Sequence, residues 1–518
     1  MKSIFIGLVL AAVAGWAQAA PARVTIAQGA LEGTVDNGVA VFKDIPYAAS
    51  PVGPLRWRPP APPPRWRGVR EATTFGPACM QSKPSWAEAL SVSEDCLTLN
   101  IWAPAGARRA PVMVWIHGGA FVWGTGASAF YDGSNFVRRG IVLVTINYRL
   151  GRFGFFAHPA LTAEARGGPT ADYGLMDQIA ALKWVKANIA AFGGDPARVT
   201  IAGESAGAMS VNFLMAAPAA RGLFVGAISE SGFGRSPGST LAEAERVGES
   251  FADSVGVKGD GPTAAAALRA LPAEALVKPP KGLLDPARPW PVVDGRLIPQ
   301  QPFEAFARHA EAKVPYLVGG NSWEAALLPQ LTADPAAAMK RLGPDEAAAA
   351  SLYDAADHPR RAAADILTDA AVIEPDRYLA ERVAADGHEA FVYYFAYLPA
   401  ALRARLIGVP HGGEIGYVFG NLPDKPGVFA GDPFPAATPE DRKLSAAVTD
   451  YWAAFVKNGN PDSAGGPRWP SLTPATQTVM VFGDAGPEPT PHFEQPKLDL
   501  MTARAVRAGG TVAAAPRS

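Results

Sequence analysis

The stretch that decides the fold is Val199-Thr-Ile-Ala-Gly203-Glu-Ser205-Ala-Gly207, followed by an apolar run over 208–217. Residues 199–202 are apolar or β-branched and predict a buried strand, while 208–217 is compatible with a helix. A serine on a turn from strand to helix, with glycines two positions before and after it, is the pattern of a nucleophile elbow. The turn would raise the Ser205 hydroxyl above the sheet edge, where the free N–H groups of the helix favour negative charge.

The surrounding sequence repeats the alternation of strand and helix. Short apolar runs at 112–116 and 141–146 predict two more buried strands, and 177–189 has helical spacing up to Phe192-Gly-Gly-Asp-Pro. Strands that alternate with helices indicate an α/β fold with a mostly parallel sheet covered on both faces. Later runs at 314–318 and 391–397 predict further strands.

The rest of the chain shows no linker between two cores. Residues 37–70 are dense in proline and aromatic residues, which predicts extended chain laid over a domain. Residues 235–390 are rich in helix formers and are expected to form helical excursions that shape a lid or pocket wall. We therefore predict one catalytic domain over 20–518, with a flexible tail from about 504 to 518.

Composition excludes several classes of protein. The 518 residues carry 47 basic and 48 acidic side chains, a net charge of −1, and 48% are hydrophobic. This balance argues against a nucleic-acid-binding surface and against a disordered chain. Two cysteines are too few for a disulfide-stapled scaffold or a structural zinc module.

Residues 1–19 have the pattern of a signal peptide. Lys2 precedes an apolar run over 4–13, and Ala17-Gln-Ala19 matches the small-x-small cleavage rule. The run is short for a membrane span, and no other stretch approaches about 18 apolar residues. The sequence predicts an exported, periplasmic or secreted protein that begins at Ala20, is not inserted in the membrane, and matures where two cysteines can pair.

The strand at 112–116 ends in His117-Gly-Gly119-Ala120-Phe121. A glycine pair after a strand lets backbone N–H groups face a ligand without obstruction. We expect the N–H groups of Gly119, Ala120 and Ala206 to form an oxyanion hole.

The base must be a histidine well after Ser205, since this fold class orders its triad as serine, acid, histidine. Of the seven histidines, His411 stands out because Gly408-Val-Pro-His411-Gly-Gly is a tight loop that can project an imidazole into a cleft. The alternatives lie in helical, surface-like or proline-rich contexts, at His309, His358, His388 and His492.

Two carboxylates compete for the acid. Glu324 follows the strand at 314–318 through Gly319-Gly320, at the carboxyl end where α/β sites assemble. Asp294-Gly295 has the character of a plain turn. Glu324 is therefore favoured to hold the His411 tautomer and stabilise the imidazolium.

These segments together resemble the type B carboxylesterases, which include cholinesterases and para-nitrobenzyl esterases. The matching pieces are FKDIPYAASPVGPLRWRPP from Phe42, SEDCLTLNIW from Ser93, HGGAF from His117, NYRLGRFGF from Asn147, FGGDPARVTIAGESAGA from Phe192 and HGGEIGYVFGN from His411. The resemblance implies an α/β-hydrolase fold and ester hydrolysis through Ser205, Glu324 and His411. It also implies a Cys79–Cys96 disulfide with Arg56 and Glu94 paired nearby.

Three features modify this resemblance. The family's acid usually lies in an Asp-Glu-Gly context, whereas Glu324 lies between Trp323 and Ala325. Glu204 would tune the site or favour cationic substrates, or would simply be a buried carboxylate that organises hydrogen bonds. Five aromatic residues could line an apolar pocket or belong to the core: Trp86, Phe121, Trp123, Phe233 and Trp323.

The predicted reaction is acyl transfer from a small-molecule ester to Ser205 and then to water, with no metal or organic cofactor. The same machinery would suit an amidase, a lactonase or a thioesterase. A non-catalytic binding or adhesion protein is the alternative from another class, disfavoured because Ser205 and His411 are both present. The acyl group, the alcohol and the oligomeric state do not follow from the sequence.

Overall fold

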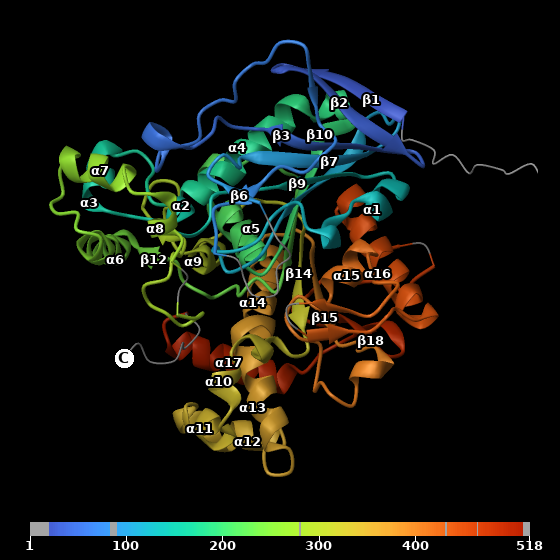
Figure 1. The fold of residues 1–518 in the computed structure, drawn as a ribbon. Coiled ribbons are helices and arrows are strands. Elements are labelled where there is room, and N and C mark those ends of the chain that lie inside the picture. Colours follow the sequence, from blue (N-terminus) through green and yellow to red (C-terminus); the bar gives the residue numbers. More distant parts are fainter. Residues whose placement is uncertain (1–19, 83–90, 279–280, 430–431, 464, 511–518) are drawn as a thin grey trace, which may run out of the picture.

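A computed structural model describes residues 20–82, 91–278, 281–429, 432–463 and 465–510. Its centre is a twisted sheet (Figure 1), in which the described residues contribute thirteen strands. The short strand β4 (Val69–Glu71) pairs with β2 outside the main order of strands. The other strands follow one another across the sheet in the order β1 (Ala20–Ile26), β2 (Gly29–Asp36), β3 (Val39–Pro46), β7 (Thr98–Pro104), β9 (Val142–Ile146), β8 (Ala110–Ile116), β10 (Gly194–Glu204), β11 (Gly226–Glu230), β14 (Tyr316–Asn321), β15 (Ala390–Phe395), β18 (Val479–Gly483) and β19 (Gly486–Thr490).

The middle of this sheet is parallel, as the alternating strands and helices predicted. Strands β9, β8, β10, β11, β14, β15 and β18 run in one direction, so their carboxyl ends share one edge. At that edge Gly203 pairs with Ile116 of β8, and Glu204 pairs with Glu230 of β11. The chain segments that leave β8, β10 and β11 therefore begin side by side.

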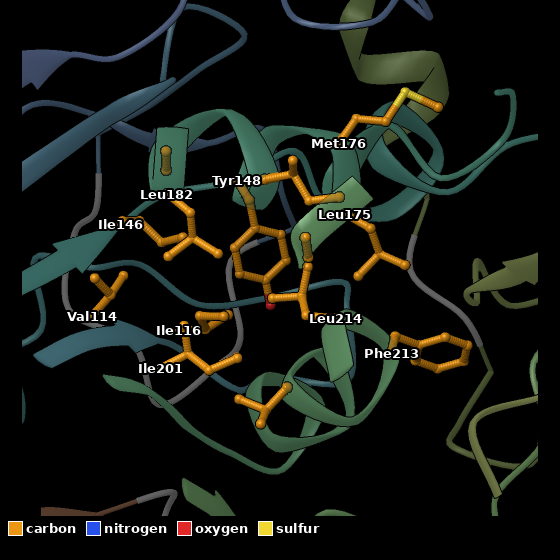
Figure 2. Close-up of a cluster of buried hydrophobic side chains, with 14 of the residues drawn as sticks. Val114, Ile116, Ile146, Tyr148, Leu175, Met176, Leu182, Ile201, Phe213 and Leu214 are labelled. Atoms are coloured by element: carbon orange, nitrogen blue, oxygen red, sulfur yellow. The ribbon is translucent and has the colours of Figure 1, made fainter. Parts of the chain in front are cut away.

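Both faces of the sheet are buried. Along β8, Val114 and Ile116 point into one core with residues of α4 (Tyr173–Asn188) and α5 (Ala206–Ala216), part of which Figure 2 shows. Met113 and Trp115 point into a second core with α1 (Ser134–Arg138), α15 (Ile415–Phe419) and α16 (Pro439–Asn458). A strand buried on both faces reads as a continuous apolar run, which explains why these strands were recognisable in the sequence.

The helical excursions form two groups, one at the left and one at the bottom of the view in Figure 1. One group contains α2 (Gly151–Gly154), α3 (Pro159–Glu164), α6 (Leu241–Ser254), α7 (Pro262–Arg269) and α8 (Ala273–Leu276). The other leads through α10 (Pro329–Thr332), α11 (Pro335–Lys340), α12 (Glu346–Leu352) and α13 (Pro359–Thr368) to α14 (Glu374–Ala385). The short α9 (Pro302–Ala307) packs against α5 and α14.

Some boundaries differ from the sequence prediction. The helix expected at 177–189 begins at Tyr173, and the strand expected at 314–318 runs from Tyr316 to Asn321. The antiparallel strands β1, β2, β3 and β7 were not predicted. Part of the proline-rich segment that was expected as extended chain forms β3. The sequence also did not predict three small two-stranded sheets: β5 (Ala78–Cys79) with β6 (Val92–Ser93), β12 (Ser239–Thr240) with β13 (Val292–Val293), and β16 (Gly427–Phe429) with β17 (Asp432–Phe434).

The predicted tail begins too early. Helix α17 (Gln495–Arg507) continues past residue 504, and Arg504 donates hydrogen bonds to the Leu342 carbonyl at 2.6 Å and to Asp345 at 3.0 Å. Met501 and Ala505 are buried against the rest of the protein. These contacts between distant segments fix the end of the helix, and no local sequence signal reveals them. The predicted signal peptide at 1–19 lies outside the described residues, as does Trp86.

The covalent and ionic pairs implied by the resemblance are present. Cys79 and Cys96 form a disulfide, and Arg56 binds both carboxylate oxygens of Glu94 at 2.8 and 2.6 Å. None of the helices in the described part of the chain is long and apolar enough to cross a membrane.

Candidate active site

Ser205 occupies a strained turn between β10 and α5. Its backbone has φ 57° and ψ −122°, a conformation that L-residues rarely adopt, and its N–H donates to the Glu230 carbonyl at 2.9 Å. A Cβ on Gly207 would lie 1.9 Å from the Ile116 carbonyl oxygen, so only glycine allows α5 to start so close to β8. The serine therefore stands at the carboxyl edge of the sheet and at the N-terminus of a buried helix.

The loop after β8 adopts an unusual backbone. Gly119, Ala120 and Phe121 have φ values of 107°, 53° and 62°, and the Gly119 carbonyl accepts the N–H groups of Val122 and Trp123. A Cβ on Gly119 would lie 2.3 Å from the Trp123 carbonyl oxygen. No described residue accepts a hydrogen bond from the N–H of Gly119, Ala120 or Ala206, which leaves three donors for an oxyanion.

His117 anchors this loop and does not act as a base. Its ring stacks on Tyr148 with 4.5 Å between ring centroids, and the Tyr148 hydroxyl donates to the His117 carbonyl at 2.9 Å. Burial lowers the pKa of His117 to about 4 against the effect of its contact with the Gly118 carbonyl. The ring is therefore neutral at pH 7, and it packs in the interior next to the glycine loop.

Glu324 lies directly after β14 and contacts His411. Its Oε2 is 2.5 Å from His411 Nδ1, while its Oε1 accepts the Ser231 hydroxyl at 2.5 Å and the Asn321 N–H at 2.7 Å. The carboxylate is buried. Three donors thus fix both oxygens, and the structure brings the predicted acid and base together.

The loops that carry Glu324 and His411 are joined through their backbones. The Trp323 N–H donates to the Val409 carbonyl at 2.9 Å, and the Val409 N–H donates to Ser322 Oγ at 2.9 Å. Trp323 and Pro410 also form an isolated parallel bridge. These contacts fix the two loops, and so Glu324 and His411, relative to each other.

The competing candidates are engaged elsewhere. Asp294 Oδ1 accepts the N–H groups of Arg296 and Ile298, as in a turn, and its Oδ2 accepts that of Thr170. The other histidines that have side-chain partners lie away from this cluster: His309 contacts Asp386, His358 contacts Asp354, and His492 contacts Gln495.

His411 lies between two carboxylates. Its Nε2 is 3.1 Å from Glu204 Oε1 but has no hydrogen-bond partner among the described residues, Ser205 included. Burial opposes the imidazolium, but Glu324 and Glu204 outweigh it and raise the pKa of His411 to about 9. The raised pKa favours the imidazolium at neutral pH, with Nε2 next to the Glu204 carboxyl group.

Glu204 is buried, as one of the two sequence interpretations expected, and it lies near two further buried acids, Glu230 and Glu414, which were not predicted. Burial raises the pKa of Glu204 to about 7 and that of Glu414 to about 8, and it raises the pKa of Glu230 well above its usual range. Trp452 Nε1 donates to Glu230 at 2.7 Å, and Asn321 donates to Glu414. Glu230 lies in Ser229-Glu-Ser-Gly232 after an apolar strand, the one sequence signal that could have drawn attention to Glu230 and Ser231.

The aromatic candidates divide between core and site. Phe121 is fully buried against Phe155 and Trp290. Phe233 lies 5.7 Å from the His411 ring, between centroids, and Trp123 Nε1 donates to Ser82 at 3.1 Å. The described residues contain no group of three or more His, Cys, Asp and Glu side chains suited to hold a metal ion.

The fold is that of an α/β hydrolase, with a serine on the strained turn between β10 and α5. Residues 20–358 and 346–499 match the carboxylesterase family, to which this chain belongs. It is a carboxylic ester hydrolase that acts on small-molecule esters.

The relatives agree with this assignment over most of the chain. The fumonisin B1 esterase of Sphingopyxis macrogoltabida is 37% identical over 88% of this chain and 85% of its own length. The para-nitrobenzyl esterase of Bacillus subtilis is 36% identical over 89% of this chain and 94% of its own length. A solved para-nitrobenzyl esterase structure aligns with a TM-score of 0.77 and 33% sequence identity, and the alignment covers 92% of this chain and 99% of that one. A solved carboxylesterase of Geobacillus stearothermophilus aligns with a TM-score of 0.77 and 35% sequence identity, with the same two coverages.

Proposed function

We propose that this chain is an exported serine carboxylesterase that works through a covalent acyl-enzyme, with Ser205 as nucleophile, His411 as base and Glu324 as the acid that orients it. The observation that carries the proposal is the 2.5 Å contact between Glu324 and His411 at the sheet edge where Ser205 occupies a strained elbow. The signal-like segment at 1–19 supports export, with a mature N-terminus at Ala20.

The reaction proceeds by two acyl transfers. His411 Nε2 takes the Ser205 proton as Oγ attacks the ester carbonyl, and the N–H groups of Gly119, Ala120 and Ala206 stabilise the tetrahedral oxyanion. His411 then protonates the departing alcohol and leaves an acyl-Ser205. Water repeats the sequence, so that ester and water become acid and alcohol.

Glu204 gives this cycle a resting state. With Nε2 beside Glu204, the imidazole must lose its proton and turn from Glu204 to Ser205 before it can act as a base. Glu204 is then a positioning residue that holds the protonated imidazole between turnovers. Glu324 keeps its contact with Nδ1 throughout and stabilises the imidazolium.

Hydrolysis of 4-nitrophenyl butyrate tests the nucleophile. We expect Ser205→Ala to lower kcat by about 10⁶-fold, leaving the contribution of the oxyanion hole and of binding. Mass spectrometry after reaction with an alkyl fluorophosphonate should show one adduct on wild type and none on Ser205→Ala. Ser229→Ala, a buried serine on the neighbouring strand, is the control and should keep both activity and adduct. Equal rates for wild type and Ser205→Ala would overturn the proposal, and an intact N-terminus at Met1 on the exported protein would overturn the cleavage.

A further inference from the structure

Arg288 is a partly buried arginine that forms no ion pair with a carboxylate of the described residues. Its guanidinium lies over the Trp290 ring, with Cζ 3.6 Å from the ring centroid. Its side chain makes no hydrogen bond or ion pair with any described residue. Burial lowers the pKa of Arg288 to about 10 against the opposing charge of Asp285, so the group is still a cation at neutral pH. A stacked guanidinium keeps its planar fork of N–H donors, the geometry that binds carboxylates at two points.

The same stacking elsewhere in the molecule is completed by a carboxylate. Arg235 lies over Tyr378, also with Cζ 3.6 Å from the ring centroid, and binds both oxygens of Glu374 at 2.8–2.9 Å. Arg149 is likewise bound to both oxygens of Asp177 at 2.7 Å. In the described structure Arg288 has the aromatic support of Arg235 without the anion, which leaves its donors available to a ligand.

Arg288 is close to the oxyanion loop. Trp290 is fixed by its Nε1, which donates to the Pro237 carbonyl at 3.0 Å, and its ring meets Phe121 edge to face at 5.2 Å between centroids. Phe121 directly follows Ala120. A hollow adjoins these segments of the chain, since its lining includes Val122 and Pro289, the chain neighbours of Phe121 and Arg288.

The hollow has an excess of positive charge. Its lining also includes Arg152 and Lys278. The Arg152 guanidinium donates to the carbonyls of Leu276 and Lys278, whereas the exposed Lys278 ammonium has no partner among the described residues. The nearby Asp285 carboxylate is occupied by the backbone N–H groups of Lys281 and Ala287. Such a field attracts anions to the hollow and raises their local concentration.

We propose that Arg288 binds a carboxylate at the far end of the substrate, so that the enzyme prefers esters whose acyl part carries a second, free carboxylate. Lys278 adds to the positive electrostatic field of the hollow but does not orient the carboxylate. The free carboxylate is unchanged in the reaction, and only the ester bond is cleaved. This inference rests on the proposed function, ester hydrolysis at Ser205, and names the substrate class of that site.

Two matched esters test it: mono-4-nitrophenyl adipate, an anion, and methyl 4-nitrophenyl adipate, its neutral counterpart. We expect wild-type kcat/KM to be about tenfold higher for the anion. Arg288→Gln should remove this preference through a rise in KM for the anion while the rate on the neutral ester stays within twofold. Arg288→Lys should restore only part of it, since an ammonium lacks the fork. Arg67→Gln, which removes one exposed charge outside the hollow, should leave the preference unchanged.

Each other outcome has a defined meaning. If wild type hydrolyses the neutral ester through Ser205 but shows no preference for the anion, the substrate class is wrong and the proposed function stands. If Arg288→Gln slows both esters equally, Arg288 supports the fold and does not bind the carboxylate. If wild type and Ser205→Ala hydrolyse neither ester, the proposed function fails and this inference fails with it.

Discussion

The nucleophile half of the site and the acid–base half are built in different ways. Ser205 and Ala206 directly follow β10, and Gly119 and Ala120 follow its hydrogen-bonded neighbour β8 within four residues. Glu324 and His411 are 87 residues apart and belong to two separate loops. Backbone geometry alone positions the first half, whereas the second depends on hydrogen bonds between segments that are distant in sequence.

This difference predicts where substitutions act. A change in the nucleophile half removes a reacting group or distorts a strained backbone. In the acid–base half, a change at a supporting residue leaves the reacting groups in place and alters only their alignment or protonation. The predicted effects should therefore be graded in the second half, from the acid itself to the residues around it.

The largest graded effect is expected at the acid. Glu324→Gln should lower kcat by about 10⁴-fold, because an amide cannot stabilise the imidazolium or hold the required tautomer. Steady-state kinetics on 4-nitrophenyl butyrate measures this. Asp294→Asn is the matched control and should change kcat by less than about threefold. A severe loss in Asp294→Asn with little change in Glu324→Gln would reverse the assignment of the acid.

A smaller effect is expected at Ser231, whose hydroxyl donates to Glu324 Oε1 at 2.5 Å. Ser231→Ala removes one of three groups that hold the carboxylate, and loss of one hydrogen bond to a charged group corresponds to about tenfold in kcat. Ser229→Ala is the control, because Ser229 lies two residues earlier, on β11, and its hydroxyl donates to the Ala208 carbonyl at 3.4 Å. If both variants lose activity equally, the effect is one of local stability and not of acid alignment.

The smallest effect is a shift in pH dependence. The pKa of His411 is about 9, so kcat/KM should rise with pH and level off near that value, since the base must be neutral. Glu204→Gln removes one of the two carboxylates that stabilise the imidazolium, which lowers the pKa of His411 and moves the rising limb to lower pH by about one unit. The exposed Glu389→Gln should leave the profile unchanged, and a shift toward higher pH in Glu204→Gln would contradict a resting contact between Glu204 and His411.

The sequence predicted those parts of the molecule that short-range patterns encode. Strands β8, β9 and β10 are buried on both faces and are therefore continuous apolar runs, and the elbow at Ser205 has glycines where neighbouring backbones approach. The half-exposed antiparallel strands β1 and β2 were missed because they alternate polar and apolar residues between turns and carry no such run. The end of α17 was misjudged because Arg504 is fixed by residues more than 150 positions earlier.

By itself, the sequence determined the parallel α/β sheet, the serine at its elbow and the glycine loop beside it, since each depends on residues that are neighbours in the chain. Only the tertiary structure decided that Ser231 and Asn321 hold Glu324, that Glu204 faces His411 and that Glu230 and Glu414 are buried acids close by. It also decided that Arg288 lies on Trp290 without an anion. The physical reason is that protonation and alignment depend on which charges and donors meet in a low-dielectric interior, and folding brings those groups together from distant parts of the chain.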